Sequence, residues 1–198
     1  MLINQATLEG QFVVLEPLTE QHIKPLEKAV ADGDSPKLWF ASVPTAEQMA
    51  DYVHKAIADM AQGNIAYAVR SKASGEVVGT TRYYNVDEAN RRAMIGFTWY
   101  ANAAKRTPIN TESKLLLLTT LFEQAQAIAV EFRTHYFNQA SRAAIERLGA
   151  KQDGILRNHQ LMPDGSYRDT VGFSIIQSEW PAVRRNLHHL LGRRLEDS

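Results

Sequence analysis

The fold is decided by one stretch, Arg92-Ala-Met-Ile-Gly-Phe-Thr-Trp-Tyr100, with the turn Lys105-Arg-Thr-Pro-Ile-Asn110 and the segment Thr111-Glu-Ser-Lys-Leu-Leu-Leu-Leu-Thr-Thr-Leu-Phe-Glu123. The first part is rich in aromatic and apolar residues, as strands are, and the turn is polar with two cations. The last part is an apolar run of good helix formers. The order predicts a strand, a loop and the start of a helix.

A helix start in this position suits an anion. The N–H groups of a first helical turn have no intrahelical partner and lie at the positive end of the helix dipole, so they can bind phosphate or pyrophosphate. Lys105 and Arg106 would add positive charge there. A simpler interpretation is that Asn110 or Thr111 caps the helix while both cations are solvated. This stretch alone leaves both interpretations open.

Composition narrows the class of protein. The chain has 198 residues, 44% hydrophobic and 22% charged, which predicts a single globular domain over residues 1–198. Basic and acidic residues both number 22, so no overall field would attract nucleic acid or an anionic membrane. The absence of cysteine excludes disulfides, thiolate nucleophiles and Cys-based zinc sites, and no metal site is expected. Neither a secretory signal nor a membrane-spanning run is visible, so we expect a cytoplasmic protein.

The first half of the chain predicts two helices and three further strands. Phe12–Leu15 is a short strand, and a helix follows from Thr19 to the stop at 32–34. Thr45 and Gln48 form a capping-box pattern that begins a helix ending near Gly63. Residues 66–71 and 76–84 form a hairpin, which should continue into the strand at 92–100 as an antiparallel meander.

The second half repeats the strand, loop and helix order. Residues 130–137 alternate as a half-buried strand, Asn138 suits the N-cap of the next helix, and Gly149 suits its end. Strands at 150–162 and 167–176 flank a turn signature and form a hairpin. Ser178 is expected to cap a last helix, about residues 179–193, whose basic end from Arg184-Arg185 to Arg193-Arg194 should be solvated.

Five groups of residues occur in the order in which a known family has them. They are Leu8-Glu-Gly10 with Leu15-Glu-Pro-Leu18, Gly75-Glu-Val-Val-Gly-Thr-Thr81, Arg91-Arg-Ala-Met-Ile-Gly-Phe97, Asn138-Gln-Ala-Ser-Arg-Ala-Ala-Ile-Glu-Arg-Leu-Gly149, and Arg168-Asp169 with Ser178-Glu-Trp-Pro181. Together with the element order, residues 8–180 resemble the GCN5-related N-acetyltransferase (GNAT) superfamily, in its RimJ/RimL branch. The resemblance implies an α+β fold with a mostly antiparallel, twisted sheet of six to seven strands, flanked by helices and splayed in the middle.

The resemblance also implies acetyl-coenzyme A as the acetyl donor. In the family, the loop before the central helix has the pattern Gln/Arg-x-x-Gly-x-Gly/Ala, and its amides hold the pyrophosphate. Here Lys105 takes the first position, while Pro108 and Asn110 replace the two glycines. Proline has no N–H, so one donor is missing. The implied cofactor residues in this loop are Lys105, Arg106, Thr107, Ile109, Asn110 and Thr111.

The pantetheine arm in such folds lies where the central strand and the next strand splay apart, and it bonds to free backbone groups as an added strand would. The resemblance assigns Phe97, Thr98 and Trp99 to one side of this gap, and Asn138 and Ser141 to the other. For Asn138 and Ser141, plain helix capping is the alternative.

The usual acid and base positions of the family are apolar here. Many relatives have a Glu where this chain has Met94, and a Tyr where it has Ile145. Ser141, or a water that it holds, could protonate the leaving thiolate, and His135 titrates in the range of a base. The alternative is that His135 lies on an exposed face or packs in the core, and that proton transfer depends on proximity and solvent water.

Acceptor-binding residues are expected on the segments that border the gap, namely Trp39, Arg82, Tyr83, Tyr84, His159 and Met162. Ordinary packing is the alternative for each. The sequence thus predicts an N-acetyltransferase that transfers acetyl directly to a primary amine, such as a peptide N-terminus, an amino acid or a small amine. The competing hypothesis is an acyl-coenzyme A binding or sensing module without catalysis.

A homodimer is also expected. The C-terminal segment carries an apolar stripe that must be buried against its own sheet or against a partner. The stripe consists of Trp180, Val183, Leu187, Leu190 and Leu191.

Overall fold

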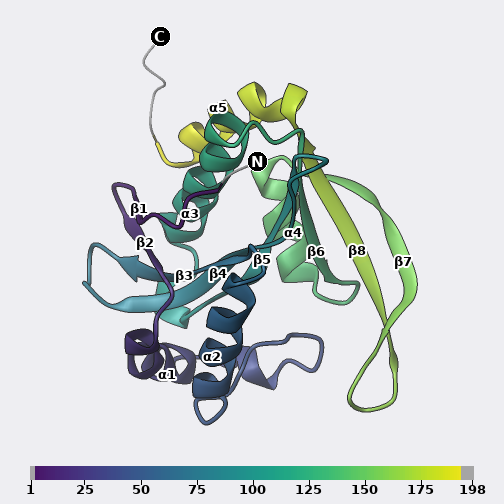
Figure 1. The fold of residues 1–198 in the computed structure, drawn as a ribbon. Coiled ribbons are helices and arrows are strands. Elements are labelled where there is room, and N and C mark those ends of the chain that lie inside the picture. Colours follow the sequence, from purple (N-terminus) through teal and green to yellow (C-terminus); the bar gives the residue numbers. More distant parts are fainter. Residues whose placement is uncertain (1–2, 193–198) are drawn as a thin grey trace.

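The computed structural model describes residues 3–192, so the prediction for Arg193 and Arg194 lies outside the described residues. Within them, eight strands form one open sheet (Figure 1). The strands are β1 (Leu8–Glu9), β2 (Val13–Pro17), β3 (Ile65–Ser71), β4 (Val77–Asp87), β5 (Arg92–Tyr100), β6 (Ala129–His135), β7 (Lys151–Leu161) and β8 (Tyr167–Ile176). Their order in the sheet is β1-β2-β3-β4-β5-β6-β8-β7. Seven match predicted strands; the eighth, β1, has two residues, too few to show a period.

Helices cover both faces of the sheet. They are α1 (Ile23–Ala31), α2 (Met49–Met60), α3 (Pro108–Thr119), α4 (Gln139–Leu148) and α5 (Trp180–Leu190). Side chains of α1 and α2 form one apolar core with the sheet, and those of α3, α4 and α5 form a larger core on the other face. Figure 1 shows α1 and α2 below the sheet and α3 and α5 above it. The predicted α+β fold is confirmed.

The middle of the sheet is splayed, as predicted. Every neighbouring pair of strands is antiparallel except β5 and β6, which are parallel. Their pairing ends at Met94 and Glu131, although β5 continues to Tyr100. The rest of β5 therefore has no strand partner on its β6 side.

Three helix starts were predicted at the wrong residue. Thr107, not Asn110 or Thr111, is the N-cap of α3. Helix α2 begins at Met49, although the side chain of Gln48 does accept a hydrogen bond from the amide of Thr45 at 3.1 Å. At α5 a 3₁₀ turn, Gln177–Glu179, precedes the helix, so Ser178 is not its cap. The predicted ends of α4 are confirmed, with Asn138 as N-cap and Gly149 at φ 106°.

The stripe of α5 is largely buried within the chain. Trp180, Val183 and Leu187 belong to the large core, and the Trp180 ring stacks on Phe122 at 5.2 Å between centroids. The observation that suggested a homodimer thus has another explanation, and the homodimer stays a prediction.

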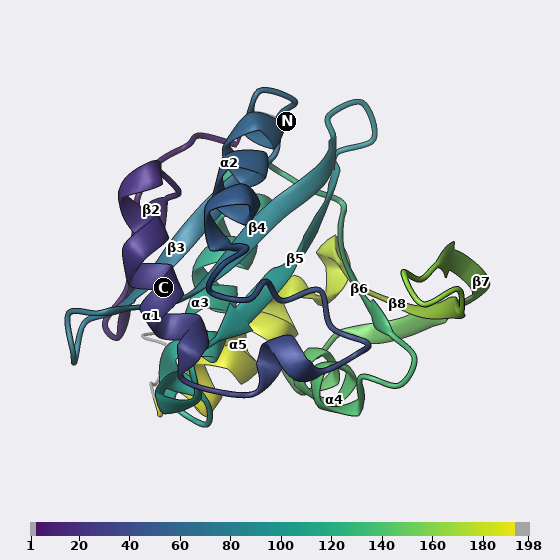
Figure 2. The ribbon, with the colours of Figure 1, turned by 90° about the horizontal axis from the view of Figure 1, so that it is seen from below.

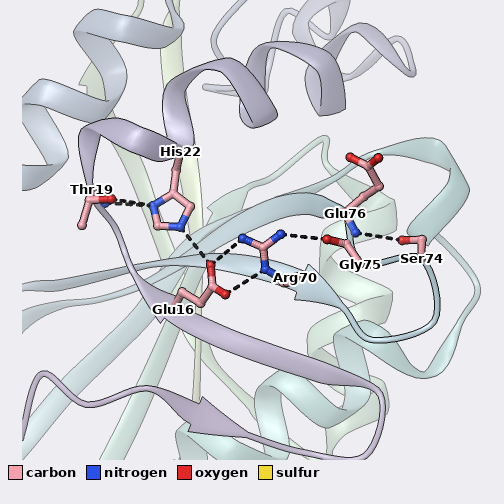
Figure 3. Close-up of polar contacts among 7 residues, drawn as sticks. All are labelled: Glu16, Thr19, His22, Arg70, Ser74, Gly75 and Glu76. Atoms are coloured by element: carbon pink, nitrogen blue, oxygen red, sulfur yellow. Dashed lines mark hydrogen bonds and ion pairs between the residues drawn. The ribbon is translucent and has the colours of Figure 1, made fainter.

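An ion-pair network ties the N-terminal strands together (Figure 3). Arg70 of β3 donates two hydrogen bonds to Glu16 of β2, at 2.8 and 2.9 Å. His22 Nε2 lies 3.0 Å from the same carboxylate, and His22 Nδ1 accepts from the amide of Thr19 at 3.0 Å. Arg70 foremost, and His22 less strongly, lower the pKa of Glu16 to about 2 although burial opposes this.

Candidate active site

A β-bulge marks the point where β5 leaves β6. Between the pairs Thr80↔Trp99 and Arg82↔Gly96, β5 has one residue more than β4. Phe97 lies in this bulge with φ 49°, a left-handed conformation that is uncommon for an aromatic residue. The hydroxyl of Thr80 donates to the carbonyl of Phe97 at 3.0 Å, which holds the bulge in place. The predicted residues Phe97, Thr98 and Trp99 thus lie at the unpaired part of β5.

The start of α3 retains the features of an anion site. Thr107 Oγ1 accepts from the amide of Ile109 at 3.3 Å and donates to the carbonyl of Ala104 at 2.7 Å. Pro108 occupies the first helical position, for which its fixed φ is suited, although it offers no N–H to an anion. Ile109 and Thr111 have buried side chains, and the Ile109 amide already donates to Thr107 Oγ1, so an anion would have to share or replace that bond.

Three cations lie near this helix start, and they differ in whether their side chains already have hydrogen-bond partners. The ammonium of Lys105 is bound by Asn102 Oδ1 at 2.6 Å and lies 3.3 Å from Ser35 Oγ. Arg106 is exposed at φ 61° and makes no side-chain hydrogen bond or ion pair with any of residues 3–192. Arg147 of α4 donates to Thr111 Oγ1 at 3.0 Å. Sequence reasoning missed Arg147, because only the packing of α4 beside α3 brings it here.

At the start of α4, the capping role is confirmed for Asn138. Its Oδ1 accepts from the amide of Ser141 at 3.0 Å. Both side chains are half-buried. Their roles toward a cofactor stay predictions.

His135 does not fit the role of a general base in this arrangement. Its ring is only 2% exposed, and Nδ1 accepts from the amide of Phe137 at 3.1 Å, so Nε2 carries the proton. Nε2 is buried without a hydrogen-bond partner. Burial, with a smaller effect of Arg168, lowers the pKa of His135. Neither nitrogen offers a free lone pair to an ammonium.

The loop between α1 and α2 covers His135. The Trp39 ring lies 5.0 Å from the His135 ring and 5.8 Å from Phe137, centroid to centroid. In Figure 2 this loop runs under the sheet toward α4. Two other predicted substrate residues, His159 and Met162, lie on or beside the β7–β8 hairpin, and His159 Nδ1 contacts Thr170 Oγ1 at 3.1 Å. Trp39, His159 and Met162 do not line the cleft that lies beside the bulge at Phe97.

A cleft of about 380 Å³ opens on the α2 face of the sheet, beside the bulge. The residues that line it include predicted acceptor residues Arg82 and Tyr84 and predicted cofactor residue Phe97. The others are Ser42, Tyr52, Lys55, Ala56, Asp59, Asn64, Ala66 and Asn85. Tyr83 points to the opposite face, where it is fully buried and its hydroxyl donates to the carbonyl of Leu117 at 2.8 Å. Predicting Tyr83 as a substrate residue was therefore wrong, because neighbouring strand residues face opposite sides.

A second residue that sequence reasoning missed is Lys114 of α3. Its ammonium is buried against the α3 face of β4 and β5, where it donates to Thr98 Oγ1 at 2.7 Å and to Thr81 Oγ1 at 3.1 Å. Burial lowers the pKa of Lys114 to about 7. No local pattern indicates this role, because Lys114 precedes four leucines and looks like the polar edge of an apolar helix.

Residues 3–192 contain neither a cluster of metal-ligating side chains nor a helix able to span a membrane. Nowhere in this range do three or more His, Asp or Glu side chains gather as they would around a metal ion. No helix among these residues combines the length and apolar character needed to cross a membrane.

Comparison with known proteins identifies the family. A model described as an acetyltransferase (GNAT) domain matches residues 13–151. YdaF of Bacillus subtilis (strain 168), provisionally named a ribosomal N-acetyltransferase, is 32% identical over 106 residues, 54% of this chain and 57% of YdaF. The match thus spans little more than half the length of this curated relative.

Solved structures extend the likeness to nearly the whole chain. A GCN5-related N-acetyltransferase from Brucella melitensis is 31% identical with a TM-score of 0.86, over 95% of this chain and 86% of that one. RimL, a ribosomal L7/L12 α-N-protein acetyltransferase, has a TM-score of 0.76 over 86% of this chain and 94% of its own, but its 20% identity shows the fold alone. Another RimL structure contains coenzyme A. The predicted family is confirmed: this chain belongs to the acetyltransferase (GNAT) family, with RimJ/RimL-like relatives.

Proposed function

We propose that this protein transfers an acetyl group from acetyl-coenzyme A to a primary amine, with a peptide or protein N-terminus as the first candidate acceptor. One observation carries the proposal. The bulge at Phe97 borders the unpaired edge of β5 and also lines the 380 Å³ cleft, so a thioester and an amine could meet there. The name of the Bacillus subtilis relative supports a protein N-terminus as acceptor.

The residues of the chain fit the cofactor in two places. The unpaired edge of β5 can bind an amide-containing arm as an added strand. The start of α3 offers backbone N–H groups, with Arg106 and Arg147 as cations for a pyrophosphate. Pro108 has no N–H and the Ile109 amide already donates to Thr107 Oγ1, so the two arginines would carry a larger share of the pyrophosphate binding.

The proposed reaction needs no covalent enzyme intermediate. Acetyl-coenzyme A supplies an acetyl group activated as a thioester; the acceptor nitrogen bonds to its carbonyl carbon, the carbon–sulfur bond breaks, and the nitrogen loses a proton as the thiolate gains one. A backbone N–H of the bulge would polarise the carbonyl as negative charge develops. Holding the two reactants side by side would lower the barrier further, because it makes a bimolecular step effectively unimolecular.

Water is the proposed proton carrier. Met94 and Ile145 are buried and apolar, and His135 offers no lone pair. Ser141 remains the proposed donor to the thiolate, directly or through water. These apolar positions also favour the competing function, an acyl-coenzyme A binding module without catalysis.

Mass spectrometry of an acceptor panel separates the two functions. The panel contains peptides with free N-termini, amino acids and polyamines, each incubated with acetyl-coenzyme A, and we expect at least one to gain an acetyl group. A thermal-shift titration with coenzyme A runs in parallel, because a ligand of the native state raises the melting temperature. Stabilisation without transfer would favour the binding module, and a flat titration at millimolar ligand would contradict both functions.

A further inference from the structure

Arg82 is a buried cation without an anion. Its side chain is only 5% exposed, and Nε and Nη2 are buried with no hydrogen-bond partner in the described chain. Two other arginines of the sheet do have carboxylates: Arg70 pairs with Glu16, and Arg92 with Glu131. Burying a charge is costly unless it is paired and hydrogen-bonded. The described residues therefore satisfy only part of the hydrogen-bonding capacity and charge of Arg82.

Two aromatic rings hold the guanidinium. Its central carbon lies 4.4 Å from the centroid of the Tyr52 ring and 4.5 Å from that of Phe97. Tyr52 is itself fixed by a hydrogen bond of 3.0 Å between its hydroxyl and that of Thr80. Such stacking offsets part of the free-energy cost of removing the cation from water and fixes the plane of the guanidinium. It uses none of the five N–H donors of the guanidinium.

The fork lies where an acceptor must bind. Arg82 lines the cleft and pairs across the sheet with Gly96, next to the bulge residue Phe97. The cleft has one further cation, Lys55, and one acid, Asp59. Beyond Tyr84, which also lines the cleft, two cations, Arg133 and Arg168, and one acid, Glu131, are close enough to influence the Tyr84 hydroxyl. Cations thus outnumber acids around the place where the amine would meet the thioester.

We infer that Arg82 binds a carboxylate of the acceptor, so that the preferred acceptors are primary amines that carry a carboxylate. This inference rests on the proposed transferase function and names its substrate class. A guanidinium fork can hold both oxygens of a carboxylate, a geometry that an ammonium lacks. The carboxylate can come from an acidic side chain near a peptide N-terminus or from the α-carboxylate of a free amino acid.

Matched acceptors test the inference and separate the two sources. One arm compares C-terminally amidated peptides that differ only by Asp against Asn, or Glu against Gln, at the first or second residue. The other compares amino acids with their carboxamides. A hydrogen-bonded charge pair predicts that the carboxylate member of at least one arm has a kcat/KM about 10- to 100-fold higher than its amide.

Variants connect the preference to Arg82. Arg82→Gln keeps a polar stem without charge and should bring the ratio for matched acceptors close to one. Arg82→Lys keeps the charge without the fork and should restore only part of it. Lys55→Gln removes the other cation of the cleft and tests whether Lys55 rather than Arg82 sets the preference; because Lys55 is exposed, we expect the ratio to change less than about threefold. The matched control is Lys24→Gln, a highly exposed lysine of α1 outside the cleft, whose ratio should equal that of wild type. Melting curves and coenzyme A titrations check that each variant folds and binds cofactor.

The outcomes distinguish this inference from the proposed function. Wild-type transfer at equal kcat/KM to both members of every pair would overturn the inference and leave the transferase intact. A ratio that survives Arg82→Gln but disappears in Lys55→Gln would overturn the role of Arg82. If wild type acetylates nothing, the proposed function fails, and binding of succinate is then measured by calorimetry. Binding that Arg82→Gln abolishes would support the carboxylate site, and no binding to wild type would overturn it.

Discussion

Two buried cations, Lys114 and Arg82, lie on opposite faces of β4 and β5, and they differ in the partners that the chain provides for them. Lys114, on the α3 face, donates to Thr81 and Thr98, and burial lowers its pKa to about 7. Arg82, on the α2 face, lies between two rings with two N–H-bearing nitrogens unpartnered, beside a cleft. An ammonium can lose its charge when it is buried, whereas a guanidinium keeps its charge.

This difference in partners distinguishes a residue that stabilises the fold, Lys114, from a residue of the proposed acceptor site, Arg82. Lys114 finds its hydrogen-bond acceptors inside the chain and can become neutral, so it needs nothing from outside. Arg82 pairs with no carboxylate among residues 3–192, and an acceptor carboxylate would complete its interactions. Arg70 is the reference case, since Glu16 supplies within the chain what we expect the acceptor to supply to Arg82.

The largest expected effect concerns the charge of Lys114. Its folded pKa of about 7 lies below the usual value of a lysine, so between these values the unfolded chain binds more protons. Stability should therefore rise with pH above 7, by about 2–3 kcal/mol between pH 7 and 9 for a fully buried group. Lys114→Met should remove this rise while the 2.8 Å contact between Thr81 and Thr98 remains.

Urea unfolding at pH 6, 7, 8 and 9 measures this difference between wild type and Lys114→Met. Lys24→Met, a highly exposed lysine on α1, is the control and should keep the wild-type slope. Equal pH dependence of wild type and Lys114→Met would show that Lys114 is charged when buried, and the contrast with Arg82 would disappear.

A smaller effect is expected for Glu16, which tests the reference ion pair. Its folded pKa of about 2 lies below its unfolded value, so its contribution is complete above about pH 5 and is lost as the pH falls toward 2. Because the pair is partly exposed, Glu16→Gln should cost about 1–2 kcal/mol at pH 7 and nothing near pH 2. Unfolding curves along a pH series test this, and a constant cost at every pH would contradict it.

The smallest effect is expected at Asn138, where a structural partner is already present. Losing the bond between Asn138 Oδ1 and the amide of Ser141 in Asn138→Ala should cost about 1 kcal/mol of stability. Asn138→Ser should restore most of it. If Asn138 also contacts the cofactor, the serine variant still binds coenzyme A more weakly in isothermal titration. Wild-type affinity in Asn138→Ser would leave only the capping role.

Local patterns predicted most of the fold. Alternation and turn residues located seven strands, and the N-cap at Asn138 and the left-handed Gly149 were both expected. The start of α3 was predicted too late, although Pro108 is typical of a first helical position and could have indicated Thr107 as the cap.

The site was predicted less completely, because it depends on contacts between distant segments. Strand alternation puts Arg82 and Tyr84 on one face, but nothing local shows that Tyr52 and Phe97 enclose the guanidinium. His135 looked like a base until its ring nitrogen was found to accept from the next-but-one amide. The positions of Lys114 and Arg147 depend on tertiary packing: α3 against the sheet brings Lys114 to Thr81 and Thr98, and α4 near α3 brings Arg147 to Thr111.

If Arg82 binds the acceptor while Lys114 stabilises the fold, their variants must differ in activity. The most direct measurement is the kcat/KM of acetyl transfer to the best carboxylate-bearing acceptor, at saturating acetyl-coenzyme A, for Arg82→Gln and Lys114→Met side by side. We predict a loss of about 10- to 100-fold in Arg82→Gln with the fold intact, and a change below about threefold in Lys114→Met. Full activity in Arg82→Gln together with a large loss in Lys114→Met would contradict the account.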